Sequence, residues 1–247
     1  MAIAVFLNPM AASVAYFKKA IKMMFTLRRF SKPLNVTLVA LLLACTMPAW
    51  ADNEAQFKQA MTAYEAGHYS QALRLLQPLA QQDDAKAQYN LGLLYENGWG
   101  VTQNYKKAVA WYQKAANQGI AEAQYNLGVM YEEGRGVQQD YQQAAAWYEK
   151  AANQGYVQAQ NNLGAWYEVH RDYEQAMFWY QKAANQGHAR SQLNLGLLYY
   201  DGKGVAQDEQ QAKAWWQKVL AQPDTPENAK VKEWARAFMK LEKESSH

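Results

Sequence analysis

The chain has 247 residues, of which 25 are Lys or Arg and 22 are Asp or Glu. Residues 1–51 hold six of the bases and no acid, so the rest of the chain carries a net charge of −3. A mildly acidic body with mixed charges gives no reason to expect nucleic-acid binding, which needs a concentrated basic face. Ala, Gln, Leu and Tyr dominate, and only three prolines follow residue 51, which favours helices over strands.

The N-terminal segment has the order of a secretory signal peptide over residues 24–51. Residues 28–32 supply three positive charges, residues 36–44 form an apolar run, and Ala49 and Ala51 are the small residues expected before a cleavage site. The run is shorter than the roughly 20 residues that span a bilayer, so no stable membrane span is expected after cleavage. The sequence therefore predicts cleavage after Ala51 and a periplasmic or secreted protein.

Two alternatives concern this end of the chain. Leu42-Leu43-Ala44-Cys45 is an imperfect lipobox, so lipidation of Cys45 is an alternative to cleavage after Ala51. Residues 1–23 precede the positive region without a clear role, and an over-extended gene start is one interpretation of them. Cys45 is the only cysteine, so the body that follows has no disulfide and no Cys-based metal site.

A repeated pattern organises the body. The segment 87–92, Ala-Gln-Tyr-Asn-Leu-Gly, returns at residues 123–128, 159–164 and 191–196, with spacings of 36, 36 and 32 residues. The short spacing falls where a glycine-containing loop, present at residues 133–140, has lost four residues. A loop deletion leaves both helices of a unit whole, which a stack of repeats tolerates.

Each unit is predicted to form two antiparallel helices. In the first helix, Ala87, Leu91 and Tyr95 step by four residues and form one apolar stripe. Gly92 costs that helix roughly 1 kcal/mol relative to alanine, so its recurrence predicts close approach of the partner helix.

The second helix of each unit has its own start and stop signals. A capping residue precedes it, and a Gln three positions later in the last three units predicts a capping box. The Asn-Gln-Gly ending predicts left-handed glycines after the helix. The capping residues are Asn104, Asp140, Asp172 and Asp208, and the glycines are Gly119, Gly155 and Gly187.

Helical elements flank the four units. Residues 52–84 predict a tightly turned helix pair, and residues 223–247 predict a capping helix that starts after Thr225. Terminal caps with a polar outer side are what an open-ended stack requires. The predicted organisation is an N-terminal stretch at 1–23, a signal peptide at 24–51, a helix pair at 52–84, repeats at 85–120, 121–156, 157–188 and 189–222, and a capping helix at 223–247.

These residues resemble the Sel1-like repeat family, relatives of the tetratricopeptide repeat with a longer, glycine-containing loop. The pattern A-x-A-Q-Y-N-L-G-x-x-Y…G-x-G-V-x-Q-D-Y-x-x-A-x-x-W-Y-x-K-A-A-x-Q-G covers residues 85–222 in four consecutive copies. Residues 161–173 depart from it by losing the G-x-G loop, and the 52–84 pair is similar to an ordinary tetratricopeptide repeat.

The resemblance implies an all-α fold, a right-handed α-solenoid of stacked antiparallel helix pairs whose first helices line a concave groove. Members are typically adaptors for protein complexes, and exported bacterial members are associated with envelope functions and host contact. Some cysteine-rich relatives carry a β-lactamase label, which is not transferred because this body lacks those cysteines.

By similarity to tetratricopeptide repeats, the groove is expected to bind a protein or peptide. An asparagine recurs in all four units, and a carboxamide can both donate and accept, so it could satisfy the backbone of an extended peptide. The alternative is that each asparagine bonds its own helix or its neighbour's. The glutamates at the end of this groove would favour a basic or amine-bearing segment of the partner. Alternatively, they only form a solvated face. The candidate groove residues are Tyr89, Asn90, Leu93, Glu96, Tyr125, Asn126, Val129, Glu132, Asn162, Glu168, Asn194, Leu197 and Tyr200.

Two sets of tryptophans require separate interpretations. Those that recur at helical spacing are predicted to be packing residues rather than a carbohydrate-stacking surface. Trp99 occupies a loop position where the sister repeats have Arg135 and Lys203, and it is either a contact point or folds onto its own unit. The recurring tryptophans are Trp111, Trp147, Trp179 and Trp215.

No catalytic chemistry is expected. His68, His170 and His188 are single and scattered, and the chain has no H-E-x-x-H, G-x-S-x-G or phosphate-binding glycine motif. The sequence therefore predicts a non-catalytic scaffold with no cofactor and no metal. The first alternative is an envelope glycan or peptidoglycan binder that uses the aromatic residues, and the second, less favoured one is a weak hydrolase.

Overall fold

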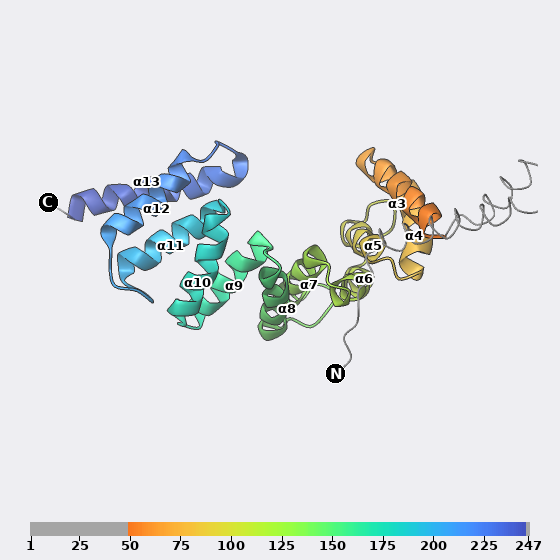
Figure 1. The fold of residues 1–247 in the computed structure, drawn as a ribbon, viewed down its shortest axis with the longest axis horizontal. Helices are drawn as coiled ribbons and strands as arrows, with labels where there is room; N and C mark the ends of the chain where they lie inside the picture. Colours follow the sequence, from red (N-terminus) through yellow and green to blue (C-terminus); the bar gives the residue numbers. More distant parts are fainter. Residues whose placement is uncertain (1–48, 246–247) are drawn as a thin grey trace, which may run out of the picture. The chain divides into compact units, whose positions relative to one another are not determined.

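The computed structural model describes the backbone of residues 49–245 and the side chains of residues 52–240. The described part of the chain folds into eleven α-helices and contains no strand (Figure 1). The all-α prediction is therefore confirmed. The signal-peptide run and Cys45 lie outside the described residues, and the predicted cleavage bond after Ala51 falls in the first turn of the first helix.

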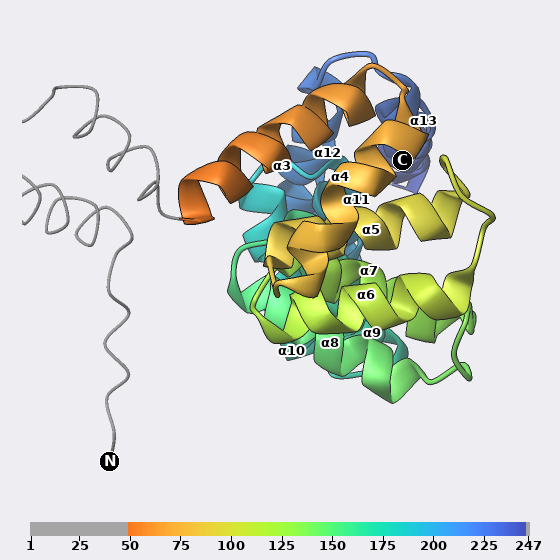
Figure 2. The same cartoon turned by 90° about the vertical axis from the view of Figure 1, so that its right-hand side faces the viewer.

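The helices follow one another in pairs, and consecutive helices pack together along the chain. The last helix packs on both members of the pair before it, and Figure 2 shows the same succession from a second side. This is the predicted solenoid of stacked antiparallel pairs. The helices are α3 (Ala49–Glu65), α4 (Tyr69–Gln81), α5 (Ala85–Asn97), α6 (Tyr105–Asn117), α7 (Ala121–Glu133), α8 (Tyr141–Asn153), α9 (Val157–Val169), α10 (Tyr173–Asn185), α11 (Ala189–Asp201), α12 (Glu209–Ala221) and α13 (Pro226–Ser245).

The glycine inside each first helix lies against an aromatic ring of the second helix. A Cβ atom at Gly128 would lie 2.6 Å from Cε1 of Tyr148, closer than a real methyl group can approach. The predicted close approach is confirmed, because only a residue without a side chain lets the ring reach the helix backbone. The same relation joins Gly92 to Tyr112, Gly164 to Tyr180 and Gly196 to Trp216.

The predicted helix caps are present, with one difference. The side chain of Asp140 accepts hydrogen bonds from the backbone N–H groups of Gln142 and Gln143 at the start of α8. Its own N–H donates to the carbonyl of Tyr131, 2.9 Å away, and not to a glutamine side chain as in a capping box. The cap therefore ties α8 to α7. At the other end, Gly155 has the predicted left-handed conformation, with φ of 91°.

Buried glutamines connect successive units, a role that the sequence did not predict. Gln88 is fully buried, and its side-chain nitrogen donates to the carbonyl of Ala80 in the preceding pair, 3.1 Å away. Its side-chain oxygen accepts from Gln118, at the end of its own unit, at 2.8 Å. A satisfied buried amide fixes the register of its neighbours. The same bond joins Gln124 to Gln154, Gln160 to Gln186 and Gln192 to Gln222.

Three of the four recurring tryptophans are buried packing residues, as predicted, and Trp111 is half-buried and packs against the core of the preceding pair. Trp147, Trp179 and Trp215 expose only 8%, 5% and 8% of their surface, which leaves no ring face open for a sugar. The lysine three residues later covers each ring, and the ammonium of Lys150 lies 3.5 Å from the ring centroid of Trp147. These cation–π contacts close the outer side of the second helices.

Candidate binding surface

All thirteen predicted groove residues lie on the first helices of the four units, α5, α7, α9 and α11. Asn90 is buried with 7% of its surface exposed, and the other twelve are half-buried. The structure thus brings the candidates to equivalent positions on successive helices. Their contact with a partner stays a prediction.

The asparagines bond to the protein itself. Asn90 donates to the carbonyl of Lys86 in its own helix, 2.8 Å away. Asn126 lies beside the hydroxyls of Tyr89 and Tyr112 in the preceding unit, where its amide opposes the rise of their pKa. Asn162 lies in the same way beside Tyr125 and Tyr148, and Asn194 beside Tyr180. The alternative interpretation therefore holds for Asn90, and the other three amides lie close to tyrosines of the neighbouring unit.

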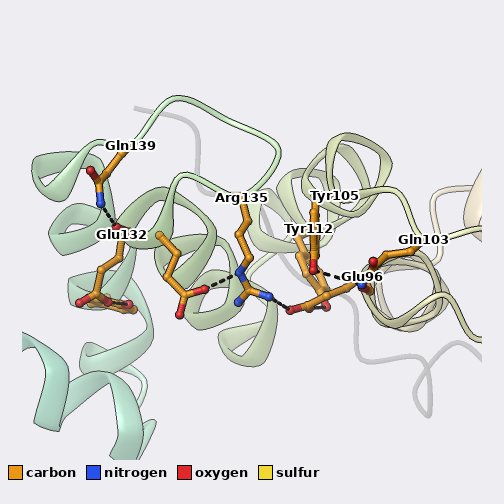
Figure 3. Close-up of polar contacts among 9 residues, drawn as sticks. Glu96, Gln103, Tyr105, Tyr112, Glu132, Arg135 and Gln139 are labelled. Carbon is orange, nitrogen blue, oxygen red and sulfur yellow. Dashed lines mark hydrogen bonds and ion pairs between the residues drawn. The ribbon is translucent and has the colours of Figure 1, made fainter.

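The glutamates of the first helices accept hydrogen bonds from the buried tyrosines of the second helices. The hydroxyl of Tyr112 donates to Oε2 of Glu96 at 2.5 Å (Figure 3). The pKa of Tyr112 is raised well above its usual value of 10. The largest cause is burial, followed by the charge of Glu96 and the hydrogen bond to it. The hydroxyl therefore stays protonated and donates. Equivalent bonds join Tyr148 to Glu132 and Tyr180 to Glu168.

Loop side chains reach back to the preceding unit. Arg135, between the two glycines of its loop, forms an ion pair with Glu96 at 3.0 Å (Figure 3). Its guanidinium carbon lies 5.5 Å from the ring centroid of Tyr105, the first residue of α6. The loop can lie this close because Gly136 has no side chain, since a Cβ there would be 2.5 Å from the carbonyl carbon of Tyr105.

Trp99 is also a loop side chain that contacts the preceding pair of helices. Its ring stacks on Tyr69 with centroids 5.0 Å apart and meets the edge of Tyr64 at 5.8 Å. Trp99 is half-buried and so packs on the preceding α3–α4 pair rather than on its own unit. This packing is not evident from the sequence of a single repeat, because the contact crosses to the neighbouring unit.

The three histidines that the sequence predicts to form no catalytic or metal site occupy separate positions. His188 precedes α11 and accepts from the N–H of Ser191, and His170 stacks on Trp166. Within the described side chains, no three His, Cys, Asp or Glu residues gather where they could hold a metal ion. None of the described helices is both long enough and apolar enough to cross a bilayer.

The stacked hairpins, their glycine contacts and their unit-to-unit braces define a helical repeat solenoid. The model of the Sel1 repeat matches residues 85–120, 121–156, 157–188 and 189–222, more than half of the chain. The chain belongs to the Sel1 repeat family, whose members are typically non-catalytic scaffolds for protein interaction.

Two solved structures support this assignment. A protective antigen present in uropathogenic Escherichia coli strains, which displays an SLR fold, is 34% identical with a TM-score of 0.66, over 69% of this chain and 38% of that one. A Sel1 repeat protein from Oxalobacter formigenes is 36% identical with a TM-score of 0.63, over 66% of this chain and 69% of that one. The match thus spans well under half of the Escherichia coli structure. No curated protein matches the chain.

Proposed function

We propose that this protein is a non-catalytic scaffold, periplasmic or secreted, that binds a protein or peptide partner in the groove formed by α5, α7, α9 and α11. The observation that carries the proposal is a recurring half-buried apolar position on three of these helices, Leu93, Val129 and Leu197. On α9 the equivalent position is Ala165, which is smaller but also half-buried.

The surroundings of these positions support binding. The tyrosines, glutamates and asparagines beside them are held by hydrogen bonds within and between units, as for Tyr112 with Glu96. A surface whose side chains are already ordered loses little conformational entropy when a partner binds. The predicted signal peptide supports export, and so does the description of the similar Escherichia coli protein as a protective antigen.

Site-specific photo-crosslinking in cells that produce the full chain tests the proposal. A photoreactive amino acid is placed at Leu93, Val129 or Leu197, and in matched controls at exposed alanines of the second helices. We expect discrete crosslinked adducts from the three test positions and none from the controls, with export checked by cell fractionation. Adducts from neither set, or equally from both, would refute groove binding. The control positions are Ala110, Ala146 and Ala214.

A further inference from the structure

Each unit-to-unit junction contains a two-residue seat for a loop side chain. We define the seat as the second-to-last residue of a first helix together with the first residue of the following second helix. Three of the four seats hold a side chain from the loop of the next unit. The seats are Tyr64 with Tyr69, Glu96 with Tyr105, Glu132 with Tyr141, and Glu168 with Tyr173.

We call the loop side chain that a seat holds its guest. The chemical type of each guest matches that of the two seat residues. The seat of two tyrosines holds an aromatic ring, Trp99, which contacts both. The seat of Glu96 and Tyr105 holds Arg135, which forms an ion pair with the carboxylate and lies over the ring. A seat with a carboxylate beside a tyrosine therefore selects a cation.

The last of these seats follows the same rule more weakly. The ammonium of Lys203 lies 5.8 Å from the ring centroid of Tyr173. The pKa of Lys203 is raised chiefly by its hydrogen bond to Asp201 and by the charge of that residue, with smaller contributions from Tyr173 and Glu168. Both carboxylate seats with a loop guest thus hold a base.

The remaining seat, Glu132 with Tyr141, is built in the same way. Gln139 donates to the carbonyl of Glu132 at 2.8 Å and to the hydroxyl of Tyr141 at 3.0 Å. Gln103 makes the matching bonds to Glu96 at 2.8 Å and to Tyr105 at 3.1 Å. The two seats therefore share the same pattern of glutamine hydrogen bonds, of which Figure 3 shows Gln139 with Glu132 at one seat and Gln103 with Tyr105 at the other.

The four-residue loop deletion removes the guest of this seat. Tyr141 exposes 56% of its surface, whereas the other three seat tyrosines that begin a second helix are half-buried. Among the described residues, Glu132 forms no ion pair, and Arg171 of the shortened loop forms no hydrogen bond, ion pair or cation–π contact with either member of the seat. The seat thus offers a carboxylate beside an open aromatic face.

We propose that Glu132 and Tyr141 bind a guanidinium group, supplied by an arginine side chain of the partner protein. Arg135 in the sister seat shows the geometry, because its planar group pairs with a carboxylate and stacks near a ring at the same time. The inference rests on the proposed function, since the partner carries the arginine. It names the chemistry of one contact point at the loop edge of the same surface.

Titration of the full chain with N-acetyl-arginine methylamide tests the seat directly. The resonances of ¹³C-labelled tyrosine rings are followed by NMR, and that of Tyr141 is assigned from its loss in Tyr141→Phe. We expect Tyr141 to shift while Tyr105 and Tyr173, already covered, do not. The citrulline counterpart, which has nearly the same shape but no charge, is expected to leave Tyr141 unshifted. An unmoved Tyr141, or an equal response to citrulline, would overturn the proposal.

Two matched variants sharpen the test. Glu132→Gln keeps an acceptor for Tyr148 and is expected to weaken the response about fivefold, the effect of losing one exposed ion pair. Glu96→Gln removes the equivalent charge from the seat that Arg135 fills, and it should leave the Tyr141 response unchanged. An undiminished response in Glu132→Gln would refute the role of the carboxylate. Circular dichroism of both variants checks that the helices remain.

A loop-restored variant supplies the missing guest within the chain. Residues 170–171 are replaced by the sequence of residues 134–139, Gly-Arg-Gly-Val-Gln-Gln, and a control carries Ala in place of that Arg. The arginine loop should abolish the response of Tyr141 to the probe, whereas the alanine loop should retain part of it. Equal responses from the two loops would contradict the seat.

The crosslinking experiment separates this inference from the proposed function. If a crosslinked partner is recovered equally with Glu132→Gln, the arginine contact is refuted and the scaffold function stands. If no partner is recovered at all, the scaffold function fails, and the NMR titration still decides whether the seat binds a guanidinium.

Discussion

Replacing Gly128 with alanine tests whether hairpin packing depends on a missing side chain. Alanine favours the helix by about 1 kcal/mol over glycine. Against this, the new Cβ would lie 2.6 Å from Cε1 and 2.7 Å from Cδ1 of Tyr148, and 3.2 Å from the carbonyl oxygen of Ala144. Overpacking of a tight interior typically costs about 1–3 kcal/mol.

Tyr148 has no easy way to move aside. Its hydroxyl donates to Glu132, so a shift of the ring breaks a hydrogen bond to a charged acceptor, worth about 1.5–3 kcal/mol. Whether the ring stays or moves, the loss exceeds the gain in helix propensity. We expect Gly128→Ala to lower the free energy of unfolding by about 0.5–2 kcal/mol.

Urea denaturation followed by circular dichroism measures this change, and a double-mutant cycle isolates its cause. In a Tyr148→Leu background the ring is absent, so the same glycine substitution should be neutral or stabilising, with a coupling energy of about 1 kcal/mol or more. A wild-type background in which Gly128→Ala stabilises the protein would refute the packing argument. Equal effects in both backgrounds would refute the role of Tyr148.

Three further predictions concern titration and processing. Burial, and then Arg190, lower the pKa of His188, so the unfolded chain binds a proton that the folded chain resists and stability falls as the pH drops below about 6.5. His188→Asn, which can still cap α11, should flatten urea-derived stability between about pH 7.5 and pH 5.5, and an unchanged slope contradicts this. Burial raises the pKa of Tyr89 to about 12 and that of Tyr112 further, so ultraviolet titration should show late phenolate formation, and Glu96→Gln should lower the pKa of Tyr112. Mass spectrometry of the exported protein should find Asp52 as the first residue, and an acylated Cys45 or an uncut chain would contradict the predicted cleavage.

Local rules carried the sequence predictions that the structure confirms. Helix period, N-caps and left-handed glycines each depend on a few neighbouring residues, so they can be predicted from a short stretch of sequence. Gly92 is the most informative case. Glycine destabilises a helix, so its recurrence indicates a compensating packing contact, and the ring of Tyr112 lies against it. Repetition turned a weak local signal into a structural prediction.

Contacts between units were harder to predict, because they depend on how far one hairpin lies from the next. The asparagines illustrate this, since Asn90 bonds its own helix while Asn126 lies beside tyrosines of the preceding unit. A usable signal was present in the paired recurrence of Glu96 and Tyr112, 16 residues apart and again 16 residues apart at Glu132 and Tyr148. Such coupled spacing across repeats marks a hydrogen bond between helices.

The shortened repeat changes the surface without weakening the register of the stack. Gln160 still donates to the carbonyl of Ala152 in the preceding unit, at 3.2 Å, and still accepts from Gln186 at the end of its own unit, at 2.8 Å. The helices on either side therefore remain braced, and only the loop contact on Tyr141 is lost. A nearest-neighbour stack confines such a change to one junction. The deletion thus leaves Tyr141 exposed beside Glu132 while the hydrogen bonds between the neighbouring units are kept, which is why we place the specific contact where the chain departs from its own repeat.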